Sequence, residues 1–206
     1  MLSSRNNTST STFTISPLTV PATVDSPDAA DFIAFTGVRS VVESEQRGGA
    51  PEYFTAAEWL PAWKDSSVRM IGFVAKVDGQ VVGRGNVALP NGAGECWCAV
   101  SVLPEFRGRG IGSALYERLE QVARDEGRTT VQNQTTYPAG VAGDSIPAPT
   151  GFGSVPTDLA STRFLQYYGF SLEQVGRLSA LPCRSILQCS QRASLRRSPP
   201  QPGIGQ

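Results

Sequence analysis

The sequence predicts a single α/β (α+β) domain in which a mixed, mostly antiparallel central sheet is flanked by about four helices. The chain has 206 residues, 40% of them hydrophobic, which suits one packed domain. Three alternating apolar segments follow one another in the middle of the chain, with short turn sequences between them. After Pro104 the apolar period changes from two residues to 3.6, so the chain combines a sheet with helices.

Two helices are expected in the N-terminal part of this domain. An extended segment over residues 12–20 precedes Asp25 to Asp28, where a cap is followed by proline in a first helical turn. The first helix is expected over residues 28–45, before the glycine pair at Gly48. Its apolar stripe consists of Phe32, Phe35, Val38, Val41 and Val42. A second, short helix is expected over residues 56–64.

Three strands in meander order and a long helix form the expected centre. The strands cover residues 69–77, 80–89 and 95–103, and an Asp-Gly turn at Asp78 separates the first two. A helix then begins near Ile111 and ends near Gly127. Its apolar face contains Ile111, Ala114, Leu115, Leu119, Val122 and Ala123.

The C-terminal part combines a strand, a long loop and a last helix. The strand is expected over residues 129–136, and the Gly/Pro-rich stretch 138–156 is long enough to be a functional loop. Asp158 is expected to cap a helix that runs to Tyr168 and is closed by Gly169. An extended region over residues 170–181 follows.

The two ends differ in composition from the domain at residues 12–181. Residues 1–11 are rich in Ser, Thr and Asn and are expected to be a disordered tail. Residues 182–206 contain no acidic or aromatic residue and four arginines. They predict either a basic, low-complexity, disordered tail or a truncated or out-of-frame end.

Composition excludes several classes of function. The formal net charge is zero and only 17% of residues are charged, which argues against nucleic-acid binding. The chain has no histidine, which excludes Ser-His-Asp and Cys-His catalysis and any His-ligated zinc. Cys96 and Cys98 are expected to be reduced core residues, and no metal site is expected. No apolar run is long enough for a membrane span or a secretory signal, so a cytoplasmic protein is expected.

The segment between the third strand and the long helix carries the chemistry. Glycines at positions 108, 110 and 112 open the helix, where unpaired amides and the helix dipole favour an anion. Arg107 and Arg109 add positive charge, and the hydroxyl of Ser113 can donate another hydrogen bond. The glycine spacing does not fit a dinucleotide fingerprint, and the chain has no Gly-Lys-Ser/Thr phosphate loop.

Arg107 to Gly112 match the Arg-x-x-Gly-x-Gly pattern of the GCN5-related N-acetyltransferases, and the chain resembles this family over residues 13–181. The resemblance implies a single acetyltransferase domain whose turn binds the diphosphate of acetyl-CoA, the cosubstrate. The cofactor-binding residues that it implies are Val100, Val102, Arg107, Gly108, Arg109, Gly110, Gly112 and Ser113. The backbone around Val100 and Val102 would pair with the pantetheine arm.

Acetyl transfer also needs a base and an acid. In the absence of histidine, Glu95 on the third strand is the candidate base, with a solvent-exposed strand end as the alternative explanation of this residue. Many relatives have a tyrosine four residues before the Gly-Phe pair, where this chain has Leu165. Tyr168 is then the candidate acid, with packing as its alternative role and solvent or the acceptor as other proton sources.

The expected activity is transfer of acetyl from acetyl-CoA to a primary amine of a small molecule by direct attack. Two alternatives stay open: a catalytically degenerate acyl-CoA-binding domain, and a protein acetyltransferase. Trp59, Trp63 and Phe152 are candidates for an apolar acceptor pocket, although helical spacing also suits core packing of the two tryptophans. The chain is similar to the N-terminal half of tandem acetyltransferases, which implies a missing second domain. A homodimer is the other expected partner arrangement.

Overall fold

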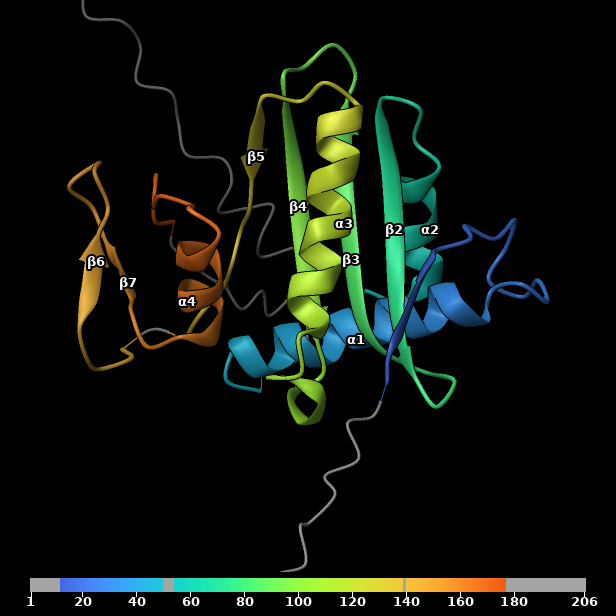
Figure 1. Ribbon diagram of the computed structural model, residues 1–206, viewed down its shortest axis with the longest axis horizontal. Helices are drawn as coiled ribbons and strands as arrows, with labels where there is room; N and C mark the ends of the chain where they lie inside the picture. Colours follow the sequence, from blue (N-terminus) through green and yellow to red (C-terminus); the bar gives the residue numbers. More distant parts are fainter. Residues whose placement is uncertain (1–11, 50–53, 139, 177–206) are drawn as a thin grey trace, which may run out of the picture. The chain divides into compact units, whose positions relative to one another are not determined.

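The computed structural model describes residues 12–49, 54–138 and 140–176 (Figure 1). Two compact units divide the chain, Met1–Val141 and Ala142–Gln206. The boundary falls inside the stretch that was expected to be a loop. The expected tails at residues 1–11 and 182–206 lie outside the described residues.

The first unit contains a five-stranded sheet in the order β1-β2-β3-β4-β5. Its strands are β1 (Thr14–Pro17), β2 (Val68–Val77), β3 (Gln80–Pro90), β4 (Glu95–Val102) and β5 (Thr130–Gln132). The first four are antiparallel, and β5 runs parallel to β4. The predicted meander is therefore confirmed to within a residue at each end.

The strand β5 is much shorter than the predicted 129–136. Its pairing with β4 ends at the pair Trp97 and Gln132. The next residue, Asn133, uses its side-chain Nδ2 to donate to the carbonyl of Cys98 at 2.7 Å. A side chain therefore occupies the position at which the backbone ladder would continue.

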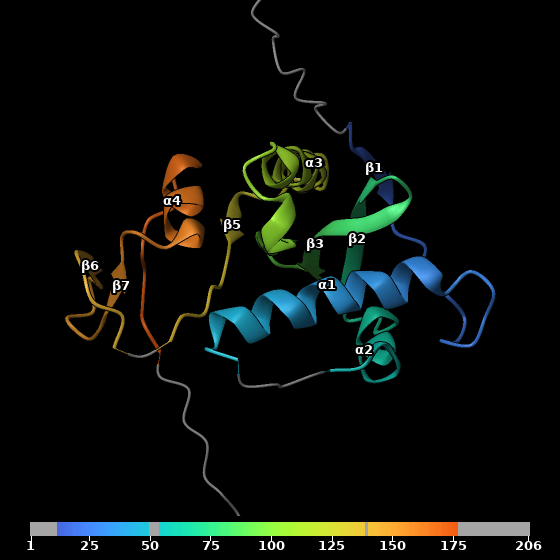
Figure 2. The ribbon, with the colours of Figure 1, turned by 90° about the horizontal axis from the view of Figure 1, so that it is seen from below.

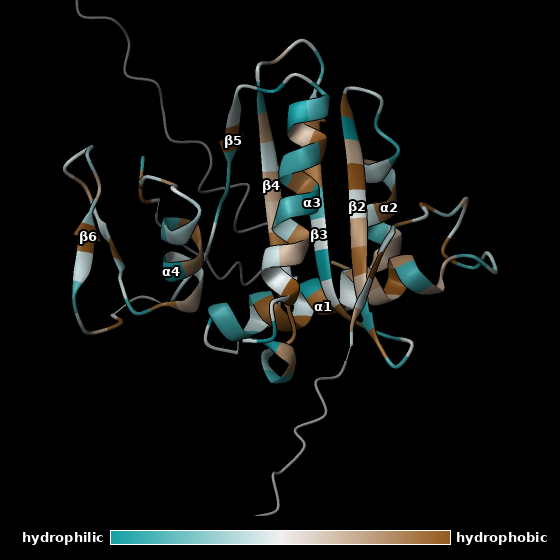
Figure 3. Cartoon of the chain, viewed as in Figure 1, coloured by the Kyte–Doolittle hydropathy of each residue, from teal (hydrophilic) through white to brown (hydrophobic). Residues whose placement is uncertain are grey.

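Helices cover both faces of this sheet, with α1 (Ala30–Gln46) and α2 (Ala56–Trp63) on one side and α3 (Ile111–Asp125) on the other (Figure 2). The short 3-10 helix η1 (Pro104–Phe106) precedes α3. Figure 3 shows polar residues along the outer side of α3. The expected helices are confirmed, with α1 and α3 each within about two residues of the prediction.

The apolar stripe of α1 differs from the prediction at Val41. Phe32, Phe35, Val38 and Val42 are buried, whereas Val41 is 48% exposed. Residues three apart on an α-helix point in directions that differ by about 60°. Val41 is nine residues after Phe32, so its side chain points to the opposite side of the helix.

Both side-chain caps that the sequence predicted are wrong. The residue before α1 is Ala29, which has no side chain that can cap the helix. Ser26, in the segment expected to provide the cap, instead donates to the carbonyl of Thr23 in a preceding turn. The residue before the last helix is Leu159, not Asp158, whose carboxylate lies 3.8 Å from Arg163. In each case the polar residue expected to cap lies at least one position before the residue that precedes the helix, so its side chain makes no cap bond to the first helical amides.

The α3 side of the core depends on two glycines of β3. A Cβ added at Gly83 would lie 3.0 Å from Cγ2 of Ile111, and one added at Gly85 would lie 3.2 Å from Cδ1 of Leu119. Ile111, Leu115 and Leu119 are fully buried here. The bare backbone of β3 lets α3 approach the sheet closely.

The second unit consists of a short antiparallel pair, β6 (Ser145–Pro147) and β7 (Ser154–Pro156), followed by α4 (Ala160–Tyr167). The predicted open loop at 138–156 is therefore partly wrong, because it contains this hairpin. Residues 170–176 form no strand, and the rest of the extended region predicted there lies outside the described residues.

No helix in the described part of the chain combines the length and apolar character needed to cross a membrane. Cys96 and Cys98 are buried free cysteines, as expected. Cys183 and Cys189 lie outside the described residues.

Burial raises the pKa of the Cys98 thiol to about 12 and also raises that of Cys96. In a variant with Cys183→Ser and Cys189→Ser, we expect a disulfide reagent at pH 8 to label the folded protein at least 100-fold more slowly than the urea-unfolded protein. The reason is that only about one thiol in ten thousand ionises at four pH units below its pKa. The rate should rise with pH as thiolate forms. Equal labelling rates for the folded and unfolded protein would contradict the burial of both thiols.

Candidate functional site

The turn between β4 and α3 has the backbone of an anion site. Gly108 and Gly110 have φ angles of 71° and 82°, in the left-handed region that favours glycine. Gly110 precedes the first residue of α3, and no side chain in the described residues caps this helix. The amides of Ile111, Gly112 and Ser113 belong to the first helical turn, which lacks internal acceptors. A negatively charged group is stabilised there by these donors and by the helix dipole.

Arg107 is held by protein groups on both edges of its guanidinium. Its Nε donates to the carbonyl of Val102 at 2.9 Å, and its Nη1 and Nη2 donate to the carboxylate of Glu45 at 2.9 and 2.6 Å. Glu45 belongs to the last turn of α1. Arg107 therefore ties the turn to α1.

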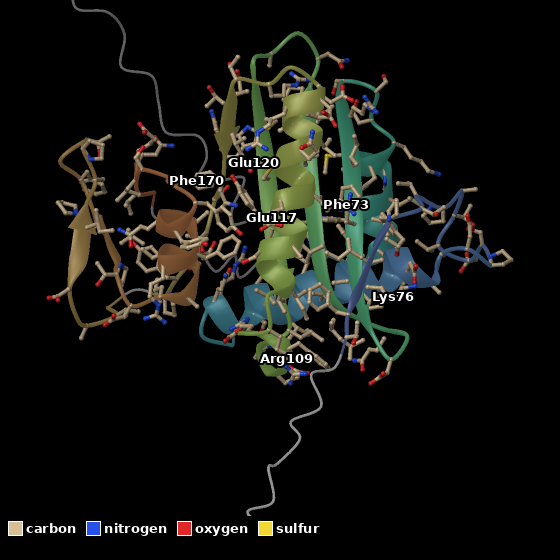
Figure 4. The ribbon with its side chains drawn as sticks, in the orientation of Figure 1. Phe73, Lys76, Arg109, Glu117, Glu120 and Phe170 are labelled. Carbon is tan, nitrogen blue, oxygen red and sulfur yellow. The ribbon has the colours of Figure 1, made fainter. Side chains whose placement is uncertain are left out.

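Arg109 belongs to the turn itself and lies beside η1, before the start of α3 (Figure 4). Its Nη2 donates to the carbonyl of Glu105 at 2.8 Å, and its guanidinium lies 5.1 Å from the ring centroid of Phe106. Both contacts lie within the turn itself. The charge of Arg109 is therefore fixed beside the open amides.

We expect Arg107→Met to weaken acetyl-CoA binding less than about 10-fold, because Glu45 already engages the guanidinium. The pair is partly exposed, so its loss should lower the free energy of unfolding by only about 0.5–1 kcal/mol. Calorimetric titration and urea unfolding measure the two effects. Glu45→Gln is the matched control, since it removes the pair and leaves the turn unchanged. A loss of binding of more than 100-fold in Arg107→Met alone would show that this guanidinium contacts the cosubstrate.

One edge of β4 is open just before this turn. The amide of Leu103 donates to Val82 of β3 at 2.9 Å, so the backbone groups of Leu103 and Ser101 face β3. Those of Val100 and Val102 face the other way, where the pairing of β4 with β5 has already ended. Arg107 occupies the Val102 carbonyl, which leaves the Val102 amide and both groups of Val100 directed to this edge. No described strand pairs with β4 there.

The predicted cofactor residues therefore come together, and Glu95 is separate from them. Glu95 is the exposed first residue of β4, whereas the turn follows the opposite end of this strand. Val102 lies seven positions after Glu95 along the strand, which corresponds to about 23 Å. The register places Glu95, Trp97, Ala99 and Ser101 on the face of the sheet that α1 covers.

The aromatic candidates have different surroundings. Trp63 is buried and packs edge-on against Phe32 and Phe35, so it is a core residue. Trp59 is half-buried, with the Arg39 guanidinium 3.8 Å from its ring centroid. Phe152, in the second unit, is 65% exposed. Tyr168 directly follows α4 in the same unit, and its ring centroid lies 4.9 Å from that of Phe164.

Sequence reasoning missed one polar group, Arg84 with Asn86 on β3. Arg84 is 2% exposed, and its Nη2 donates to Oδ1 of Asn86. The ring centroid of Phe35 lies 4.3 Å from its guanidinium carbon. The available signal was two polar residues at alternate positions in an otherwise apolar strand, which places both on one face.

Known proteins share this fold. The model of the Acetyltransferase (GNAT) family matches residues 38–140, which is half of the chain. A tandem GNAT protein from the clavulanic acid biosynthesis pathway, solved without acetyl-CoA, is 20% identical with a TM-score of 0.53, over 77% of this chain and 43% of that one. The chain thus spans less than half of that protein.

Two further solved structures are similar. An aminoglycoside acetyltransferase, meta-AAC0020, from an uncultured soil metagenomic sample in complex with sisomicin, is 15% identical with a TM-score of 0.52, over 83% of this chain and 97% of that one. The PaiA N-acetyltransferase of Thermoplasma acidophilum in complex with coenzyme A is 13% identical with a TM-score of 0.51, over 80% and 93%. No curated protein sequence matches the chain. The family match and the fold together show that the chain belongs to the acetyltransferase (GNAT) family, a family of N-acetyltransferases that use acetyl-CoA as their cosubstrate.

Proposed function

We propose that this protein transfers an acetyl group from acetyl-CoA to a primary amine of a small molecule by direct attack. The observation that carries the proposal is the uncapped start of α3 beside the open edge of β4. These two features suit the two ends of one ligand, a diphosphate and an amide-containing arm. The small-molecule class is supported by the similarity to an enzyme solved in complex with sisomicin.

In this proposal the diphosphate binds at the turn. The amides of the first turn of α3 and the Ser113 hydroxyl donate to its oxygens, and Arg109 supplies charge nearby. Gly108 and Gly110 give the backbone its left-handed path. The pantetheine arm then pairs with Val100 and Val102 as a short additional strand.

The reaction forms a bond between the amine nitrogen and the acetyl carbon and breaks the bond from this carbon to sulfur. The thioester oxygen gains negative charge in the intermediate, and an amide on the open edge of β4 stabilises it. Glu95 is the proposed base and Tyr168 the proposed donor of the proton to the leaving thiolate. Because Glu95 lies five residues along β4 from Val100, about 16 Å, its proposed role requires a chain of several water molecules between its carboxylate and the amine.

If Glu95 is the base, Glu95→Gln should lower turnover by about 10- to 100-fold at pH 7, and by less as the pH rises. The reason is that an amine loses its proton unaided in alkaline solution. A pH profile of kcat measures this, and Glu105→Gln is the matched control in the exposed part of η1. A loss that is equal at all pH values would contradict the proposed role.

The activity is tested by two measurements on the full chain. Calorimetric titration gives the acetyl-CoA affinity, and a thiol reagent follows coenzyme A release with a panel of amines. Amine-dependent release supports the enzyme. Binding without such release would favour the second candidate, a degenerate acyl-CoA-binding domain, which Leu165 at the position of the family tyrosine supports. Failure to bind acetyl-CoA would overturn both.

Two buried free thiols support a reducing compartment, such as the cytoplasm, as the proposed location.

A further inference from the structure

Arg84 is a buried cation with few hydrogen-bond partners among the described residues. Its side chain is 2% exposed, near the middle of β3. Within the described residues its Nε and Nη1 have no hydrogen-bond partner, and only Nη2 donates, to Asn86. Three of the five N–H donors of the guanidinium are on those two nitrogens. A buried charge without a partner is strongly unfavourable, so an unfilled binding group is the economical explanation.

Among the described residues, the charged groups that act on Arg84 leave one net positive charge. A second cation, Arg39 of α1, acts on Arg84, and its Nε lies 2.5 Å from the carboxylate of Glu43. These two charges cancel, and the charge of Arg84 remains. Burial and, next, Arg39 lower the pKa of Arg84 to about 9, so it is still protonated at pH 7. The site therefore suits an anion with a single negative charge.

Aromatic rings shape the site. The guanidinium carbon of Arg84 lies 4.3 Å from the ring centroid of Phe35 and 5.3 Å from that of Trp59. Arg39 lies against the same Trp59 ring. Trp59 and Arg39 are both partly exposed, so the side chains next to Arg84 extend to the surface of the protein.

The strand register places Arg84 next to the proposed path of the acyl arm. Arg84 is directly opposite Ser101 of β4. Opposite residues of an antiparallel pair have Cβ atoms about 5 Å apart. Ser101 lies between Val100 and Val102, whose backbone groups form the open edge. A ligand held by Arg84 therefore lies on the α1 face of the sheet, one strand away from that edge.

We propose that Arg84, positioned by Asn86, binds a carboxylate of the acceptor, so that the substrate is an amine that also carries a carboxylate. This inference rests on the proposed acetyl transfer and adds the substrate class. A phosphate would bring up to two negative charges to a site with one positive charge. A polycation such as an aminoglycoside would be repelled by Arg84. The acceptor is therefore chemically unlike the sisomicin of the similar structure.

The experiment compares amino acids with their amides on the full chain. The acceptors are a series from glycine to 6-aminohexanoate, the matching carboxamides, and aminoethyl phosphate. The wild-type protein should acetylate at least one acid with a kcat/KM at least 10-fold above that of its amide. Arg84→Met should abolish this preference, mainly by raising KM. Arg128→Met is the matched control, because its Nε is also buried without a partner in the described residues, and it should keep the preference.

A binding measurement separates this inference from the proposed activity. Acetate and propanoate are titrated into the wild type and Arg84→Met at constant ionic strength and followed by tryptophan fluorescence, with chloride as the reference anion. If the wild type binds a carboxylate saturably and Arg84→Met does not, the site is supported even when no amine is acetylated. In that case the proposed activity fails and the inferred site stands. Equal handling of acids and amides, a preference for the phosphate, or a preference that survives in Arg84→Met would overturn the inference. The inference would also be overturned if the protein neither acetylated any of the amino acids nor bound acetate or propanoate. If Arg84→Met does not fold, the wild-type comparison of acids with amides decides alone.

Discussion

Gly110→Asp is expected to weaken acetyl-CoA binding by on the order of 100-fold. The new carboxylate would accept hydrogen bonds from the first turn of α3 and place a negative charge where the diphosphate binds. Two like charges about 4 Å apart in a partly exposed site repel by up to about 4 kcal/mol, and solvent screening reduces this to about 3 kcal/mol. Calorimetric titration with acetyl-CoA measures the change.

Gly110→Asn is the matched control for this substitution. Asparagine has the same shape, tolerates the left-handed backbone that Gly110 adopts at φ 82°, and caps a helix equally well. Any backbone strain and any competition for the amides are therefore shared by the two variants. The difference between them isolates the charge. If both variants bind acetyl-CoA with the same affinity, the diphosphate does not lie at the start of α3.

Leu115→Ala should lower the free energy of unfolding by about 3–4 kcal/mol. Leu115 is fully buried under α3, and its Cδ1 would lie 3.2 Å from a Cβ added at Gly83. Because the packed sheet does not collapse into the cavity, the substitution costs both the transfer free energy of the removed methyl groups and the free energy of the cavity that they leave. Urea unfolding followed by circular dichroism gives the value.

Glu117→Ala is the control for Leu115→Ala, because Glu117 lies in the same helix on its outer side (Figure 4). It should change the free energy of unfolding by less than about 0.5 kcal/mol. A loss of under 1 kcal/mol for Leu115→Ala would contradict the close contact between α3 and β3.

Local sequence signals were sufficient for the elements that are bounded by strong turns. The Asp-Gly turn at Asp78 and the change of period after Pro104 located β2, β3, β4 and α3. Signals that compete with one another failed. Ser26 closes a turn with Thr23 instead of capping α1, and Asn133 ends β5 through a bond to a carbonyl 35 residues away. No local pattern encodes such a distant partner.

The same distinction applies to the site. Gly108 and Gly110 have positive φ angles, which favour glycine through local backbone geometry alone, so the sequence could predict the turn on which the proposed anion site depends. The engagement of Arg107 by Glu45 depends on a residue 62 positions earlier, and only the packing of α1 brings the two together. The burial of Arg84 and its position opposite Ser101 depend on the packing and strand register of the whole sheet, which no local pattern specifies.

The bond network of Arg107 joins the two substrate sides of the proposed enzyme. Arg107 connects Glu45 at the end of α1 with the Val102 carbonyl at the end of β4, and α1 also supplies Phe35 and Arg39 to the surroundings of Arg84. A shift of α1 when an acceptor binds would therefore pull on the diphosphate turn. Thermodynamic reciprocity then requires the donor to change acceptor affinity by the same factor, so the binding signature to look for is an equal change in the Kd of each substrate when the other is bound.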